Sequence, residues 1–150
     1  LTLLQVDADV ACGLYTLKGP ESDYTAVAGH IETLPPAAPD KRPTDHPEFR
    51  HRTLDLRRVG EDMGTVEVDC AGTGCMLIHR RVFNELRGPW FVANERHRPG
   101  FNEDYNFTIR AKRAGLTVKV DTTLECRHVG AQGVGVAEAR GHWREKVGES

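Results

Sequence analysis

The sequence predicts an α/β fold, because short segments with strand-like alternation are interleaved with segments that have helical features. Residues 10–17 and 116–120 carry the alternating side chains of strands. Residues 81–86 are expected to form a short helix. A longer helix is expected to begin near Asn102 and to stop at Gly115. Strand, helix and strand following one another in this way indicate a sheet with flanking helices.

The ends of the longer helix are marked by charge. Asn102 is a capping residue, and Glu103 and Asp104 occupy the first turn, where free N–H groups favour negative charge. The last turn is basic, and Gly115 ends the helix. Two apolar rows are expected along it, and their members are Tyr105 and Ile109 in one row and Phe107, Ala111 and Ala114 in the other. After residues 116–120, we predict a turn at 121–123 and a second strand over 124–128.

The remaining organisation is that of one domain over residues 1–130. Residues 24–34, 52–59 and 65–68 are predicted strands. The proline-rich, charged residues 35–50 are predicted to form a surface loop. Residues 131–150 are predicted to form a glycine-rich, polar and partly disordered tail.

Composition narrows the class of protein. The 150 residues are 39% hydrophobic and 28% charged, as in a soluble globular domain. A formal charge of −2 gives no reason to expect a nucleic-acid partner. No run approaches the roughly 18 apolar residues of a membrane span, and no signal peptide is visible. We therefore expect no membrane span and a cytoplasmic location. Because the sequence opens at Leu1 inside an apolar run, we also expect an N-terminally truncated fragment.

The four cysteines have two interpretations. Buried reduced thiols in strands account for them without any special chemistry. A zinc site is the alternative, since a Cys-x4-Cys pair and a Cys-x-His pair supply four soft ligands, although the spacings are not those of zinc fingers. Its ligands would be Cys70, Cys75, Cys126 and His128.

Two further features allow both a structural and a functional interpretation. The run from Ala71 to Gly74 consists of small residues, which permit close approach of the backbone to a neighbouring strand or to a ligand. The acidic pair Glu103–Asp104 compensates the helix dipole, or it presents a general base to a cleft.

The motifs taken together resemble the C-terminal portion of GT-A-fold, family-2-like glycosyltransferases. The resemblance rests on three strings, GLYTLK, GTGCMLIHRRVF and EDYNFTIRAKRAG followed by CRHVG. It implies a GT-A-like mixed sheet with flanking helices. It also implies inverting transfer of a sugar from a nucleotide-sugar donor to a hydroxyl-bearing acceptor, assisted by Mn²⁺ or Mg²⁺.

The resemblance assigns roles to individual residues. Asp104 would be the catalytic base, with Glu103 beside it to orient it or to bind the acceptor. Gly72, Thr73 and Gly74 would form a loop beside the sugar–diphosphate, and His128 would be a metal ligand. Trp90 would either stack on a sugar face or anchor the core.

Asp7 and Asp9 form an Asp-x-Asp pair that can hold a hard cation. In the resembling enzymes a helix separates such a pair from the strand that matches residues 9–15. We therefore predict that Asp7 and Asp9 belong to a strand-entry turn and that the true pair lies upstream. The alternative function is a non-catalytic carbohydrate- or partner-binding module with the structural zinc site described above.

Overall fold

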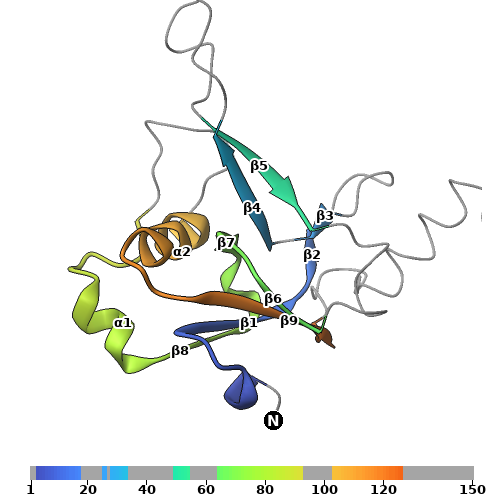
Figure 1. Ribbon diagram of the computed structural model, residues 1–150, viewed down its shortest axis with the longest axis horizontal. Helices are drawn as coiled ribbons and strands as arrows, with labels where there is room; N and C mark the ends of the chain where they lie inside the picture. Colours follow the sequence, from blue (N-terminus) through green and yellow to red (C-terminus); the bar gives the residue numbers. More distant parts are fainter. Residues whose placement is uncertain are drawn as a thin grey trace, which may run out of the picture.

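The computed structural model describes residues 3–17, 25–26, 28–33, 49–54, 64–92 and 103–126. These residues confirm the predicted α/β class, with mixed sheets and few helices. Figure 1 shows helix α2 (Glu103–Arg113) on one side of the main sheet, the short turn η1 (Leu3–Gln5) on the other, and helix α1 (Arg80–Glu85) beside one end of the strands. None of the described helices is long and apolar enough to cross a membrane.

The main sheet has four strands in the order β6-β9-β1-β8. Its central strands β1 and β9 are parallel, and both outer pairings are antiparallel. All five residues of β1 are buried, as expected for a strand with neighbours on both edges and packing on its faces. The strands are β1 (Val10–Leu14), β6 (Thr65–Glu67), β8 (Met76–Ile78) and β9 (Val118–Glu125).

Two smaller sheets continue from this one. A three-stranded antiparallel sheet has the order β5-β4-β7, and β2 pairs with β3. Figure 1 shows the β4–β5 pair extending away from the main sheet. The strands are β2 (Thr16–Leu17), β3 (Thr25–Ala26), β4 (Ala28–Thr33), β5 (Phe49–Thr53) and β7 (Cys70–Ala71). The short turn η3 (Thr73–Cys75) links β7 to β8.

Several predicted boundaries need correction. The predicted strand over 10–17 is divided into β1 and β2, and the strand over 24–34 into β3 and β4. Strand β5 begins at Phe49, so the last two residues of the predicted loop 35–50 belong to a strand that pairs with β4. The rest of that loop lies outside the described residues. So do residues 55–63 and the predicted tail 131–150.

The predicted turn at 121–123 is wrong, because β9 is one strand through this region. Asp121 does make the local contacts of a turn, since its Oδ1 accepts hydrogen bonds from the amide (2.9 Å) and the hydroxyl (2.6 Å) of Thr123. The irregularity is absorbed as a register shift: Gly13 is opposite Asp121, but Leu14 is opposite Glu125. A local turn signal has therefore become a bulge inside a paired strand.

Helix α2 follows its predicted pattern closely. Its first turn holds Glu103 and Asp104, and Gly115 follows it with a φ of 80°, which a glycine adopts without strain. The two predicted apolar rows pack into two clusters: Phe107 and Ala111 into the main core, and Tyr105 with Ile109 beside Cys70. Ala114 is exposed, contrary to prediction, because it lies past the last helical turn.

The main core joins the helices to the sheet. Phe107 is fully buried and stacks on Phe91, with ring centroids 4.5 Å apart, and lies 6.3 Å from the ring of Phe83. These contacts fasten α2 to the segment after α1. The apolar residues buried around them are Val10, Leu14, Val82, Leu86, Val118 and Val120.

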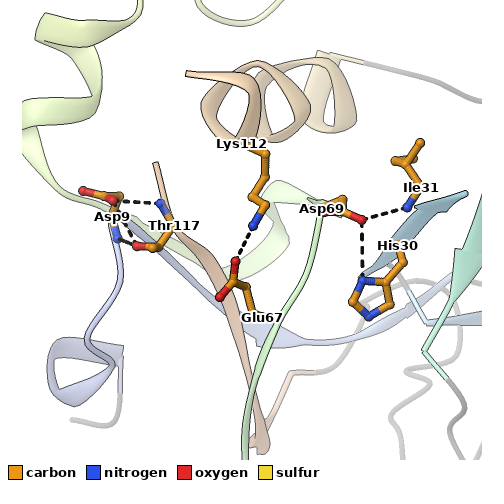
Figure 2. Close-up of polar contacts among 7 residues, drawn as sticks. All are labelled: Asp9, His30, Ile31, Glu67, Asp69, Lys112 and Thr117. Carbon is orange, nitrogen blue, oxygen red and sulfur yellow. Dashed lines mark hydrogen bonds and ion pairs between the residues drawn. The ribbon is translucent and has the colours of Figure 1, made fainter. Parts of the chain in front are cut away.

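Polar contacts tie the edges of the fold together (Figure 2). Lys112 of α2 is ion-paired with Glu67 of β6. Asp69, before β7, accepts a hydrogen bond from the Ile31 amide (2.9 Å), and its carboxylate lies 3.5 Å from Nδ1 of His30. These contacts connect the main sheet, the second sheet and α2.

Candidate functional site

The carboxylate of Asp104 lies directly against the turn η3. One carboxylate oxygen accepts a hydrogen bond from the Thr73 amide (3.2 Å) and the other accepts one from the Thr73 hydroxyl (2.9 Å). Two of the predicted site residues, 31 positions apart, therefore meet in space. Each carboxylate oxygen keeps lone pairs for a further partner. Glu103, the other acid of the pair, is exposed.

Thr108 explains how α2 is placed against η3. Its buried hydroxyl accepts a hydrogen bond from the Ala71 amide (3.2 Å) and lies 3.1 Å from the carbonyl of Asp104, one turn earlier. The last residue of β7 is thereby attached to the first half of α2. The geometry between Thr73 and Asp104 follows from this attachment.

Gly74 makes a close approach to Tyr15, the residue that follows β1. The Gly74 amide donates to the Tyr15 hydroxyl (3.1 Å), and a Cβ at position 74 would lie 2.7 Å from the Tyr15 ring. Any other residue at position 74 would have to displace that ring, which is the physical reason for a glycine here. Burial raises the pKa of Tyr15, the Gly74 hydrogen bond lowers it, and the nearby Asp104 carboxylate raises it further.

Gly72, the third predicted loop residue, is buried, whereas Thr73 and Gly74 are exposed. The predicted loop Gly72, Thr73 and Gly74 is thus accounted for within the protein: it packs on Tyr15 and holds Asp104. Thr73 and Gly74 remain exposed while making these contacts, so close packing on a neighbouring segment and contact with a ligand are both compatible with this placement.

Trp90 follows α1 and lies in the segment that Arg110 of α2 contacts. Its indole N–H donates to the Leu86 carbonyl (2.8 Å) and its ring meets Phe83 edge to face at 5.3 Å. The Arg110 guanidinium donates to the carbonyls of Arg87, Pro89 and Trp90 over 2.7–3.1 Å. Arg110 is six residues beyond Asp104, roughly 9 Å along the helix axis. Trp90 therefore anchors the end of α1, while 41% of it remains exposed.

The Asp-x-Asp pair does not fit a divalent cation. Asp9 is buried, and its Oδ2 accepts hydrogen bonds from the amide (2.8 Å) and hydroxyl (2.9 Å) of Thr117 (Figure 2). Its other oxygen is paired with the Arg81 guanidinium, and these contacts lower the pKa of Asp9 to about 2. A cation would have to displace Arg81, while Asp7 is exposed two residues away. Asp9 thus joins the start of β1 to the start of β9, which is the role expected of a residue in a strand-entry turn.

Among the described residues, Cys70 forms no metal-binding group with Cys75 and Cys126, the other proposed cysteine ligands of zinc. Cys70 is buried beside Tyr105, and its thiol lies 3.6 Å from the Gly29 carbonyl. Burial raises the pKa of Cys70 to about 12. No three histidine, cysteine or acidic side chains among the described residues form a metal-binding group. His128 lies outside the described residues.

Sequence reasoning did not identify Tyr15 or Thr108 as part of this region. Tyr15 follows the carboxyl end of β1, and Cys126 follows the carboxyl end of its parallel neighbour β9. Ligand sites in α/β proteins tend to lie beyond the carboxyl ends of parallel strands. The position of Tyr15 beyond the carboxyl end of β1 therefore indicates a site only once β1 and β9 are known to be parallel neighbours.

Comparisons with protein-family models, with curated proteins and with solved structures find no match. The class that the fold defines is accordingly an α/β protein with a mixed sheet. Its candidate site is an acidic helix N-terminus held against a glycine-flanked turn.

Proposed function

We propose that this protein is a glycosyltransferase that moves a sugar from a nucleotide-sugar donor to a hydroxyl acceptor with inversion. The observation that carries the proposal is the contact between Asp104 and Thr73. Two of the three motif strings that resemble GT-A glycosyltransferases converge at this contact. Tyr15, from the remaining string GLYTLK, accepts a hydrogen bond from the amide of Gly74, the residue after Thr73.

Asp104 is the proposed base. In a single displacement, the acceptor oxygen attacks the anomeric carbon, the bond from that carbon to the diphosphate oxygen breaks, and the acceptor proton passes to the base. Thr73 supports this role, because its two hydrogen bonds fix the orientation of the carboxylate while lone pairs remain for the acceptor. Exposure at the start of α2 makes Glu103 suited to an acceptor hydrogen bond.

The departing diphosphate needs positive charge, which the proposal assigns to Mn²⁺ or Mg²⁺. His128 is the proposed ligand from this chain, two residues after Cys126. Asp9 is not part of this proposal, because its carboxylate is already paired with Arg81 and Thr117. The exposed part of Trp90 is the proposed surface for a sugar face.

The test compares Asp104→Asn with Glu103→Gln in the full natural chain. Transfer is measured across a panel of nucleotide sugars and simple hydroxyl acceptors, and donor binding is measured by calorimetry. We expect Asp104→Asn to lower transfer by at least about 100-fold with donor affinity nearly unchanged, because an amide cannot accept the proton. Glu103→Gln should cost less than about tenfold.

Two controls separate chemistry from structure. Asparagine retains an oxygen for Thr73, and thermal unfolding of the variant should match that of the parent within a few degrees. If Asp104→Asn abolishes donor binding together with transfer, Asp104 is not the base. If the natural protein transfers no sugar from any donor and binds none, the proposed function is wrong.

A further inference from the structure

Two cysteines from distant parts of the sequence meet over Gly13, in the middle of the main sheet. A Cβ built on Gly13 would lie 2.8 Å from Sγ of Cys126 and 3.1 Å from Sγ of Cys75. Burial, together with the neighbouring Cys75 thiol, raises the pKa of Cys126 to about 11. Because Gly13 has no side chain, both sulfur atoms occupy the space above one α-carbon.

The backbone holds the pair from both sides of β1. Cys75 ends η3 immediately before β8, and β8 pairs with one edge of β1. Cys126 follows β9, which pairs with the other edge, and its amide donates to the Leu14 carbonyl (2.8 Å). The register shift in β9 opposite Gly13 and Leu14 is what carries Cys126 inward to this position.

The other two cysteines differ in environment. Cys12 and Cys70 are fully buried, and burial raises the pKa of each to about 12. Cys75 and Cys126 are only partly buried. All four are free thiols, so the two more accessible thiols are also the two that lie over Gly13. This coincidence distinguishes the pair from an isolated surface cysteine.

We propose that Cys75 and Cys126 form a modification site, a dithiol that closes reversibly to a disulfide by exchange with a small-molecule disulfide. One thiolate attacks the small disulfide, releasing one small thiol and forming a mixed disulfide. The second protein thiolate then attacks the protein sulfur of that bond and releases the second small thiol. Two protein thiols are oxidised, one small disulfide is reduced to two thiols, and no other reactant is needed.

The closed bond links η3 to the exit of β9. Cys75 lies two residues after Thr73, so the disulfide would constrain the turn that holds Asp104. Disulfide closure needs no sugar substrate and is measured without one, so it does not depend on the proposed glycosyl transfer.

The experiment incubates the natively folded protein with oxidised glutathione. We expect the loss of two hydrogen atoms in mass without a glutathione adduct, and a peptide map that joins Cys75 to Cys126 while Cys12 and Cys70 stay alkylatable. Dithiothreitol should reverse the change. Closure of this long loop should raise the Tm by roughly 4–10 °C.

Matched variants sharpen the test. Cys75→Ser and Cys126→Ser should each leave a single reactive thiol that accumulates a glutathione adduct. Gly13→Ala retains all four cysteines but places a carbon 2.8 Å from one sulfur and 3.1 Å from the other, so the sulfurs must shift, and it should slow closure at least about tenfold. A folded Gly13→Ala protein that closes as fast as the parent would overturn the inference. So would a parent protein that gives only glutathione adducts or that joins other cysteines.

Discussion

At the residue scale, Asp9 shows how a motif-like carboxylate can be structural. It is buried and accepts two hydrogen bonds from Thr117, and its second oxygen is paired with Arg81. The same atoms that would bind a metal in an Asp-x-Asp pair are committed to joining β1, β9 and α1. Tertiary contacts, not residue type, decide the role of this acid.

Asp9 should make the protein sensitive to acid. Its pKa is lowered from 3.8 to about 2, mainly by the hydrogen bond from Arg81. A lowered folded-state pKa stabilises the protein above pH 4, and that stabilisation is lost as the pH falls toward 2. Solvent at Arg81, which is 61% exposed, reduces the effect to about 1 kcal/mol. Urea unfolding of Asp9→Asn and the parent should therefore differ at pH 7 and converge near pH 2.

Asp7→Asn is the matched control, because Asp7 is exposed two residues earlier. Its free energy of unfolding should stay within about 0.5 kcal/mol of the parent at both pH values. A difference between Asp9→Asn and the parent that does not change between pH 7 and pH 2 would contradict the assigned electrostatic role.

At the scale of elements, α2 connects the candidate site to the core. Its first turn presents Asp104 to Thr73, its middle buries Phe107, and Arg110 holds the carbonyls that follow α1. The charge pattern at its ends and its two apolar rows were visible in the sequence. Its partners were not, since they come from segments some 20–45 residues away.

Replacing Phe107 with alanine should destabilise the protein by about 3–5 kcal/mol, because the ring is fully buried between Phe83 and Phe91. Chemical denaturation measures the change. Asn106→Ala, on a less buried face of the same helix, should cost less than about 1 kcal/mol. Equal losses in the two variants would mean that Phe107 does not anchor α2.

At the scale of the whole molecule, the metal distinguishes the proposed enzyme from a zinc-stabilised binding module. We expect the purified natural protein to retain little zinc and to bind Mn²⁺ weakly and exchangeably, with transfer lost in EDTA and restored by added Mn²⁺ or Mg²⁺. Elemental analysis before and after dialysis measures this. Stoichiometric zinc that survives dialysis, together with unfolding in chelator, would favour the binding module.

Features set by contacts within a few residues were predicted correctly, whereas features set by contacts between distant residues were not. Helix α2, its acidic first turn and its stop at Gly115 were predictable, because they depend on contacts within a few residues. The turn predicted at Asp121 is wrong because local contacts do not decide this segment. Its local hydrogen bond to Thr123 is present, but pairing with β1 keeps the segment in a strand.

The sequence by itself therefore determined the α/β class, the helix with its charged ends and the small residues around Thr73. Only the tertiary structure decided that Asp104 meets Thr73, that Asp9 is paired with Arg81 and that Cys75 and Cys126 share the space above Gly13. Helical periodicity and end charges are set by neighbours along the chain. Strand order and register, which bring distant residues together, are set by burial and hydrogen bonding across the whole sheet.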